Sequence, residues 1–189
     1  GYGAGGREPK IGPELSFGIT MQQHVREPIL LIKTSWGGKS LNTDFRSPSA
    51  GPYQFNEQQI ENFKKRNKDV AAERKARAER TGVYYQLMLE HIRKVLGDIK
   101  RLYPFYDAKA GFELAGFVWF QGWNDMVDSG TYPTRGQSGG YASYSKNLAH
   151  FIRDVRRDLK APKLPFVIGV MGAGGPIAKY GPDQKRYAG

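Results

Sequence analysis

Apolar and polar residues follow two kinds of pattern along this chain, one typical of strands and the other typical of helices. Three short runs are almost continuously apolar, as strands are when both faces of a parallel sheet are covered. Each run leads into a loop that is rich in glycine or polar residues. The runs predict three buried strands, at Ile29–Thr34, Ala115–Phe120 and Pro165–Met171.

Four other stretches indicate helices. In three of them, apolar residues recur every three or four positions, which places these residues on one buried face. Pro13 suits the first position of a helix, Pro28 ends that helix, and Pro104 closes a later one. The remaining stretch is helical by composition but only weakly amphipathic. The expected helices cover residues 13–27, 54–80, 84–102 and 141–159.

The alternation of helices with apolar strands predicts an α/β fold, a three-layer α/β/α sandwich on a parallel sheet. The length of 189 residues suits one domain with a substantial core. There is no internal repeat and no sign of a second domain. Residues 1–189 are therefore expected to form a single domain.

The stretch Phe117–Met126 is the first candidate site, because it passes from a buried strand into the polar loop Gln121–Asp125. In an open α/β sheet, ligands and catalytic groups collect at the carboxyl ends of the strands. Similar loops at Trp36–Ser40 and Gly172–Gly175 would open on the same edge. Asn and Asp also suit an ordinary turn through their local hydrogen bonds, an alternative that this stretch alone leaves open.

Composition and charge narrow the possible functions. The chain has no cysteine, which excludes disulfides, thiol nucleophiles and zinc–thiolate sites. No apolar run reaches the roughly 18 residues of a membrane span. The net charge is +11, and residues 64–80 hold eight Lys and Arg against three Asp and Glu. This segment lacks stacking aromatics and its acids are interspersed, so a solvated helix face is favoured over nucleic-acid binding.

Three other motifs are assigned no chemistry. The segment Gly37–Ser40 lacks the earlier glycine of a phosphate-binding loop, and Ser138 follows residues that do not resemble the strand before a nucleophilic serine. His24, His91 and His150 are expected to be structural or solvent-facing, because none has an Asp three residues before it. No His, Asp and Glu cluster has metal-ligand spacing, so no metal and no cofactor is expected.

Two blocks of sequence resemble a known family. Leu31–Ser40, which contains Ser-Trp-Gly-Gly, resembles the second conserved block of the SGNH (GDSL-like) hydrolases, closest to the sialate O-acetylesterases and related carbohydrate acetyl esterases. Phe117–Asp125 resembles the third block. Ile11–Gly18 and Lys146–Leu159 match the same branch in the same order. The resemblance covers most of the chain, and residues 54–80 look like a charged helical insertion within the domain.

This resemblance implies a flavodoxin-like SGNH hydrolase fold and ester hydrolysis by a serine through an acyl-enzyme. It implies that the backbone N–H of Gly38 and the side chain of Asn124 form part of the oxyanion hole, with Gln121 as a further contributor. Donors aimed at a developing negative charge lower the barrier of acyl transfer. Asp125 is expected to support the turn.

The family also implies an acetylated carbohydrate or glycan as the partner and an extracellular or periplasmic location. The residues assigned to substrate binding are Trp36, Gly37 and Trp123. Trp123 stands where the closest branch has the Glu of Gln-Gly-Glu-Ser-Asp, although Gly-x-Asn-Asp matches the wider superfamily. The replacement of this Glu by Trp123 removes a carboxylate, so the substrate class can differ from that of the closest branch.

The nucleophilic serine block is expected to precede Gly1, and the Asp-x-x-His block to follow Gly189. The chain is thus expected to be the middle of a hydrolase domain, inactive alone and active as the full-length enzyme. Two alternatives remain open. One is a noncatalytic module that stacks sugars on Trp36, Trp119 and Trp123, and the other is a basic scaffold for an anionic partner.

Overall fold

The structure is a computed structural model that describes residues 12–171, 173 and 175–189. The described chain divides into two compact units. Unit 1 holds the described residues up to Gly38 together with Glu90–Tyr106, and unit 2 holds Lys39–Leu89 with Asp107–Gly189. The expected loop Gly172–Gly175 lies partly outside the described residues.

Helices dominate both units. Unit 1 contains α1 (Pro13–Gln22) and α5 (Ile99–Leu102), and α4 (Val83–Leu96) has its first residues in unit 2 and the rest in unit 1. The other elements belong to unit 2: η1 (Pro48–Ala50), α2 (Glu57–Lys65), α3 (Val70–Arg80), β1 (Phe117–Trp119), α6 (Trp123–Val127), α7 (Ala142–Asp158), β2 (Phe166–Ile168), η2 (Ile177–Lys179) and α8 (Pro182–Lys185).

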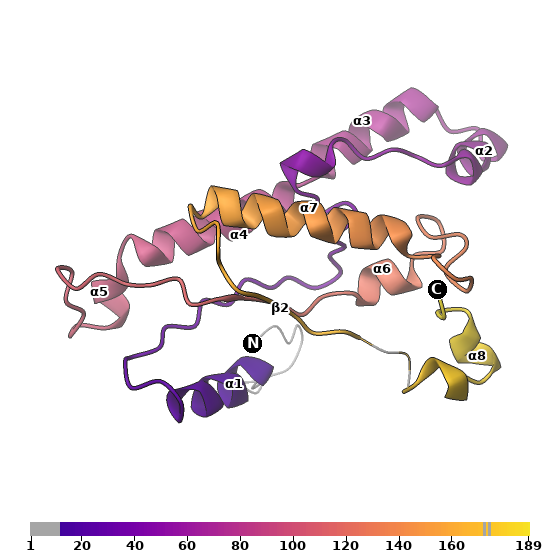
Figure 1. Cartoon of the computed structure of the whole chain (residues 1–189). Helices are drawn as coiled ribbons and strands as arrows, with labels where there is room; N and C mark the ends of the chain where they lie inside the picture. The colour runs from indigo at the N-terminus through magenta and orange to yellow at the C-terminus, as the bar shows by residue number, and fades with distance from the viewer. Residues whose placement is uncertain (1–11, 172, 174) are drawn as a thin grey trace, which may run out of the picture. The chain divides into compact units, whose positions relative to one another are not determined.

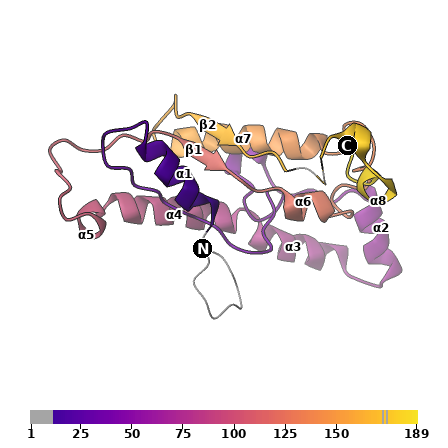
Figure 2. The ribbon, with the colours of Figure 1, turned by 90° about the horizontal axis from the view of Figure 1, so that it is seen from below.

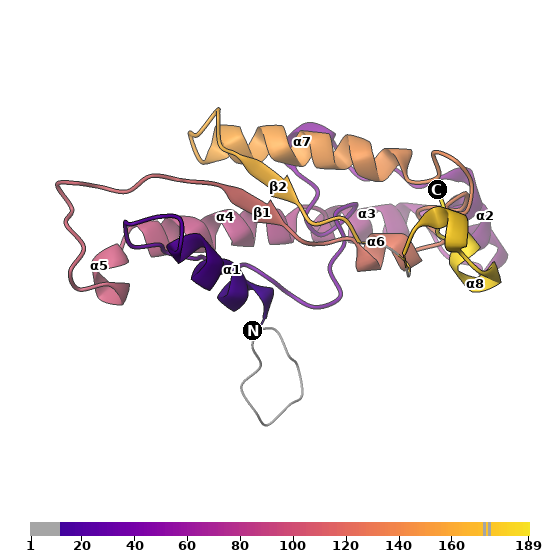
Figure 3. The same cartoon turned by 60° about the horizontal axis from the view of Figure 1, so that its bottom comes forward.

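Unit 2 contains a small parallel sheet, which confirms the α/β class. Strands β1 and β2 pair with Phe117 opposite Phe166, and Figure 3 shows them side by side. Helix α7 lies along this sheet (Figure 2) and covers one of its faces. The ring of Phe151 on α7 lies 4.4 Å from that of Trp119 on β1, and Phe151 is fully buried. The expected buried face of α7 is thus confirmed.

The other face of this sheet is exposed in unit 2. Because side chains alternate along a strand, Val118 points away from the face that carries Trp119. Val118 is 50% exposed, and its partner Val167 on β2 is 58% exposed. The expectation that β1 and β2 are covered on both faces is therefore wrong for the described chain.

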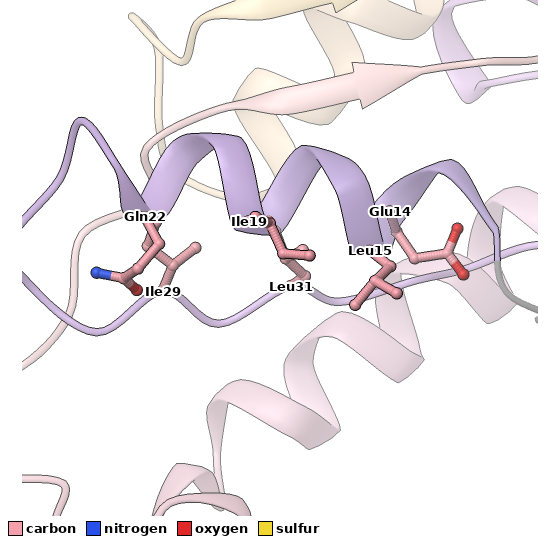
Figure 4. Close-up of a pocket in the computed structure, with 7 residues that line it drawn as sticks. Glu14, Leu15, Ile19, Gln22, Ile29 and Leu31 are labelled. Atoms are coloured by element: carbon pink, nitrogen blue, oxygen red, sulfur yellow. The ribbon is translucent and has the colours of Figure 1, made fainter.

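The expected strand Ile29–Thr34 is also wrong, since the structure assigns no strand there. In unit 1, α1 and residues 29–31 line a shallow apolar groove that includes Leu15 and Leu31 (Figure 4). Lys33 pairs with Glu14 at 2.5 Å. The apolar composition of a strand is present, but a strand also needs a hydrogen-bonded neighbour.

The segment 54–80 is helical, as expected, but it forms two helices (Figure 1). Helix α2 begins with a capping box, in which the side chains of Asn56 and Gln59 each accept a hydrogen bond from the other's backbone N–H. The chain then breaks at Asn67, whose φ is 51°. The side chain of Asp69 caps α3 by accepting from Ala71 N–H at 2.8 Å.

The expected single helix over residues 84–102 is broken into α4 and α5. Helix α4 ends at Leu96, and Gly97 and Asp98 form a turn before α5. Glycine destabilises a helix interior because it has the most backbone freedom to lose. Helix α1 likewise ends at Gln22, earlier than Pro28 suggested.

Candidate functional site

The predicted site lies where β1 passes into α6, a segment that we call the β1–α6 corner (residues 120–125). Gly122 is the N-cap of α6, so Asn124 and Asp125 lie in the first turn of this helix. Trp123 is 60% exposed, Asn124 is half-buried and Asp125 is 1% exposed. Three consecutive side chains therefore meet three different environments.

Asp125 is the centre of a hydrogen-bond network in unit 2. Its Oδ2 accepts from Leu41 N–H at 2.7 Å and from Gln121 Nε2 at 2.8 Å. Its Oδ1 accepts from Asn42 N–H at 3.0 Å and from the hydroxyl of Tyr132 at 2.9 Å. The buried carboxylate thus has four donors, two of them from a loop far away in the sequence.

The electrostatics agree with this geometry. Burial raises the pKa of the Asp125 carboxyl, although the hydrogen bonds from Gln121 and the two backbone N–H groups act in the opposite direction. Burial and the neighbouring carboxylate raise the pKa of Tyr132, and burial raises the pKa of Tyr144 to about 12. Both phenols are therefore protonated and able to donate at neutral pH.

A second contact joins the corner to the same loop (residues 39–42). The backbone carbonyl of Lys39 accepts from Gln121 Nε2 at 3.0 Å and from Asn124 Nδ2 at 3.3 Å. Gln121 donates its other amide hydrogen to Asp125, so both of its hydrogens are used. Asn124 donates one hydrogen to Lys39, and no acceptor for the other is recorded among the residues that the structure describes.

Tyr144 on α7 fixes the corner from the other side. Its hydroxyl donates to the backbone carbonyl of Gln121 at 2.8 Å and accepts from Trp119 Nε1 at 3.1 Å. Trp119 itself is 5% exposed and packs against Phe151. Trp119 is therefore a core residue, and the hypothesis that it stacks on a sugar is wrong.

The charged group of Lys39 is turned toward its own loop. Its Nζ lies 3.7 Å from a carboxylate oxygen of Asp44 and 4.2 Å from the centre of the Tyr84 ring. The hydrogen bond with Tyr84 raises the pKa of Lys39. These contacts give the ammonium group partners within unit 2, in keeping with the exclusion of a phosphate-binding loop.

The predicted residues Trp36, Gly37 and Gly38 belong to unit 1. Trp36 is partly buried, and Gly37 is exposed in a turn. Gly38 has φ +71°, a left-handed conformation that favours glycine. The roles assigned to these three residues stay predictions, as do those of Gln121, Trp123 and Asn124.

Sequence reasoning missed the partners of the corner. Tyr132 lies in a Gly- and Pro-rich loop, and Leu41 and Asn42 contribute backbone N–H groups, which leave no trace in side-chain patterns. It also missed the hydrogen bond of 2.9 Å between Ser49 Oγ and His150 Nδ1. His24, His91 and Ser138 are exposed.

Comparison with protein families shows which family the chain resembles. The model of a carbohydrate esterase family, described as sialic acid-specific acetylesterase, matches residues 4–186. The chain belongs to this family. A search of curated proteins and a search of solved structures each found no match.

Membership of the sialic acid-specific acetylesterase family confirms the resemblance to the sialate O-acetylesterase branch of the SGNH-like hydrolases, and it supports an esterase acting on carbohydrates. In the described part of this family member, no helix is long and apolar enough to cross a membrane. The described residues contain no group of three or more His, Asp and Glu side chains that could hold a metal ion.

Proposed function

We propose that the protein is a carbohydrate O-acetylesterase that cleaves acetyl esters on sugars, and that this chain carries its oxyanion-hole residues. One observation carries the proposal. The amide of Asn124 is anchored to the Lys39 carbonyl by one hydrogen, at 3.3 Å, while its second hydrogen is left for a ligand. Membership of a carbohydrate esterase family supplies the substrate class.

The proposed reaction uses two steps. A serine attacks the acetyl carbonyl, a histidine takes its proton, and the carbonyl oxygen becomes an oxyanion that Asn124 Nδ2 and the N–H of Gly38 stabilise. Collapse of this intermediate expels the sugar oxygen, which takes the proton from the histidine. Water then releases acetate from the acetyl-serine by the same sequence of events.

In this proposal Gln121 does not donate to the oxyanion. Its two amide hydrogens are donated to Lys39 O and Asp125 Oδ2, at 3.0 and 2.8 Å. A donor that is already used twice cannot also bind an oxyanion without losing a bond. We therefore assign Gln121 to holding the corner in shape, next to Asn124 as the donor.

The proposed fold and substrate contacts follow the family. We propose a three-layer α/β/α sandwich as the complete architecture, because α7 covers one face of the parallel pair β1–β2 and the apolar, exposed other face, with Val118 and Val167, is a surface that a third layer would cover. Trp123 is 60% exposed and borders Asn124 in sequence, which suits a ring that stacks on a sugar. Trp36 and Gly37 are proposed as further substrate contacts.

The test is the Asn124→Ala variant of the full-length protein, assayed on an O-acetylated sugar. Loss of one oxyanion donor is expected to lower kcat by about 10²–10³, with little change in KM. Asn62→Ala, at an exposed asparagine of α2, is the control and should leave kcat unchanged. An unchanged kcat in Asn124→Ala would remove this residue from the oxyanion hole.

A noncatalytic carbohydrate-binding module is the second candidate, favoured by the exposure of Trp123. It predicts that the full-length protein binds acetylated sugars without releasing acetate. It also predicts that Trp123→Ala abolishes this binding, because stacking on the ring supplies the affinity. Release of acetate that depends on Asn124 would exclude this candidate.

A further inference from the structure

The carboxylate of Asp125 is too enclosed to touch a substrate. Only 1% of the residue is exposed, and each carboxylate oxygen already accepts two hydrogen bonds. Any part that Asp125 plays in the reaction must therefore act through the groups that it holds.

These groups connect Asp125 to the loop 39–42. Oδ2 holds Leu41 N–H, and Oδ1 holds Asn42 N–H, at 2.7 and 3.0 Å. The two oxygens of the Asp125 carboxylate thus bind two adjacent backbone N–H groups. This pair of bonds restrains both the position and the rotation of the loop. Charge-assisted hydrogen bonds of this kind are about twice as strong as neutral ones.

The loop in turn holds the proposed oxyanion donor. The Lys39 carbonyl accepts from Asn124 Nδ2 at 3.3 Å and from Gln121 Nε2 at 3.0 Å. Gln121 also donates to Asp125, at 2.8 Å. The orientation of the Asn124 amide therefore depends on where Lys39 lies, and Asp125 restrains Lys39 both through the loop and through Gln121.

We propose that Asp125 is a positioning residue, whose carboxylate clamps the loop 39–42 so that the Lys39 carbonyl aims the amide of Asn124 at the oxyanion. This inference rests on the proposed function of Asn124. It goes beyond support of the local turn, because the clamp reaches a loop 84 residues away in sequence.

An amide in place of the carboxylate makes a sharp probe. In Asp125→Asn, one oxygen is replaced by an NH₂ group, which is a donor. If the NH₂ replaces Oδ2 it meets Leu41 N–H, and if it replaces Oδ1 it meets Asn42 N–H. One backbone N–H thus loses its acceptor in either orientation, although the size of the side chain is unchanged.

The experiment measures kcat and KM of Asp125→Asn in the full-length protein, on the same O-acetylated sugar. Small displacements of a catalytic group can cost about 10²-fold in rate. We expect kcat to fall about 10- to 100-fold and KM to change less than about threefold, because the substrate contacts at Trp123 are untouched. An unchanged kcat would overturn the proposal.

A double-mutant cycle with Asn124→Ala separates positioning from general stability. If Asp125 acts through Asn124, Asp125→Asn should lower kcat by less than about threefold in the Asn124→Ala background, because residues that act as a unit are not additive. Fully multiplicative losses would overturn the positioning role while leaving Asn124 as the donor. A silent Asn124→Ala would instead overturn the proposed function.

The Tyr132→Phe variant tests the same proposal if Asp125→Asn does not fold. Tyr132→Phe removes one donor from Asp125 Oδ1 and retains the carboxylate, so it replaces Asp125→Asn in the cycle if that protein does not fold. We expect Tyr132→Phe to lower kcat about three- to tenfold when Asn124 is present, because the loop 39–42 is held less firmly. In the Asn124→Ala background it should not change kcat, because the two residues then no longer act together.

Asp128→Asn is the matched control. Asp128 lies directly after α6 and accepts hydrogen bonds from Gly130 N–H and Thr131 N–H, both at 3.0 Å within its own turn. It should leave kcat unchanged. A fall in kcat equal to that of Asp125→Asn would mean that any disturbance near α6 lowers the rate, which would overturn the specific role of Asp125.

Discussion

At the scale of single residues, the different roles that we propose for Asn124 and Asp125 follow from their difference in burial. Asn124 is half-buried, and one of its amide hydrogens has no acceptor among the described residues, while Asp125 is 1% exposed and both of its oxygens accept hydrogen bonds from the protein. The helical turn of α6 causes this difference, since consecutive residues of a helix point about 100° apart. Two adjacent polar residues can therefore have separate roles, Asn124 facing the proposed site and Asp125 holding the loop that supports it.

Phe151 lies among the aromatic side chains of the core of unit 2. It is fully buried, and its ring lies 4.4 Å from Trp119, 5.6 Å from Tyr85 and 5.9 Å from Phe117. Phe151→Ala is expected to lower the free energy of unfolding by about 3–5 kcal/mol, because it leaves a large cavity. Denaturant unfolding followed by circular dichroism measures this loss.

The control for this truncation is Phe105→Ala, since Phe105 is 83% exposed. Its effect should stay within about 0.5 kcal/mol, as for most surface substitutions. Equal losses in the two variants would contradict the place of Phe151 in the core.

At the scale of elements, α7 joins the core to the loops around the site. One face carries Leu148, Phe151 and Val155 into the core, and Tyr144 reaches the β1–α6 corner. The same helix carries Asp154, which is 1% exposed and accepts from Ser49 N–H at 2.8 Å. Helix α7 therefore holds η1 as well as the corner.

The stability that Asp154 provides is expected to depend on pH. Burial alone would raise the pKa of this carboxyl, but the hydrogen bond from Ser49 N–H and the charge of Arg157 hold it below its usual value of 3.8. A depressed pKa in the folded state means stability that is present above the unfolded pKa. That stability is lost as the pH falls through the folded value.

Thermal unfolding from pH 7 to pH 2 tests this expectation. The melting temperature should fall below about pH 4, where the unfolded carboxylates bind protons. Asp154→Asn should lower the free energy of unfolding at pH 7 by about 1.5–3 kcal/mol, as for loss of a hydrogen bond to a charged group, and its stability should fall less steeply with acid. Asp107→Asn, an exposed control, should keep the full slope, and an Asp154→Asn protein with the same slope as the wild type would contradict the assignment.

At the scale of the whole molecule, the described residues include the proposed oxyanion donor Asn124, and the Ser49–His150 pair is the candidate among them for creating an oxyanion. The Ser49–His150 pair has a hydrogen bond of 2.9 Å, yet the N–H of Ser49 is donated to Asp154. This backbone donor is therefore not available to an oxyanion at Ser49. The pair has the serine–histidine contact of a nucleophile and its base, but the described residues show no third group that orients His150, and the N–H of Ser49 is already used.

The chain of 189 residues by itself is therefore expected not to hydrolyse p-nitrophenyl acetate above background. Release of p-nitrophenol, followed by absorbance, is the measurement, with Ser49→Ala as the matched variant. Turnover that disappears in Ser49→Ala would contradict the expectation and would assign the nucleophile to this pair.

The basic segment 64–80 also belongs to this scale. Lys65 pairs with Glu61 at 2.8 Å and Lys68 with Glu73 at 2.6 Å. Arg77 lies 4.4 Å from the centre of the Tyr53 ring and donates to Thr43 Oγ1 at 2.9 Å. Part of the excess charge therefore acts within the protein, which favours the solvated helix face over the scaffold for an anionic partner.

The amino-acid sequence by itself determined the family, the α/β class and the existence of the main helices. Each of these depends on local signals: apolar spacing on α7, caps such as Asn56 and Asp69, and two short blocks in the right order. The spacing of apolar residues predicts a strand less reliably, because a strand forms only where a neighbouring strand pairs with it. Ile29–Thr34 had the composition of a strand, but the described chain shows no strand paired with it.

Only the tertiary structure decided how the site is held together. The bond from Leu41 N–H to Asp125 joins residues 84 positions apart, and that from Ser49 to His150 joins residues 101 apart. Periodicity reports which face of an element is buried, whereas such partners depend on how loops meet after folding. Backbone donors leave no side-chain signature, and for this reason Asp125 could be predicted as a turn residue but not as the clamp of the loop 39–42.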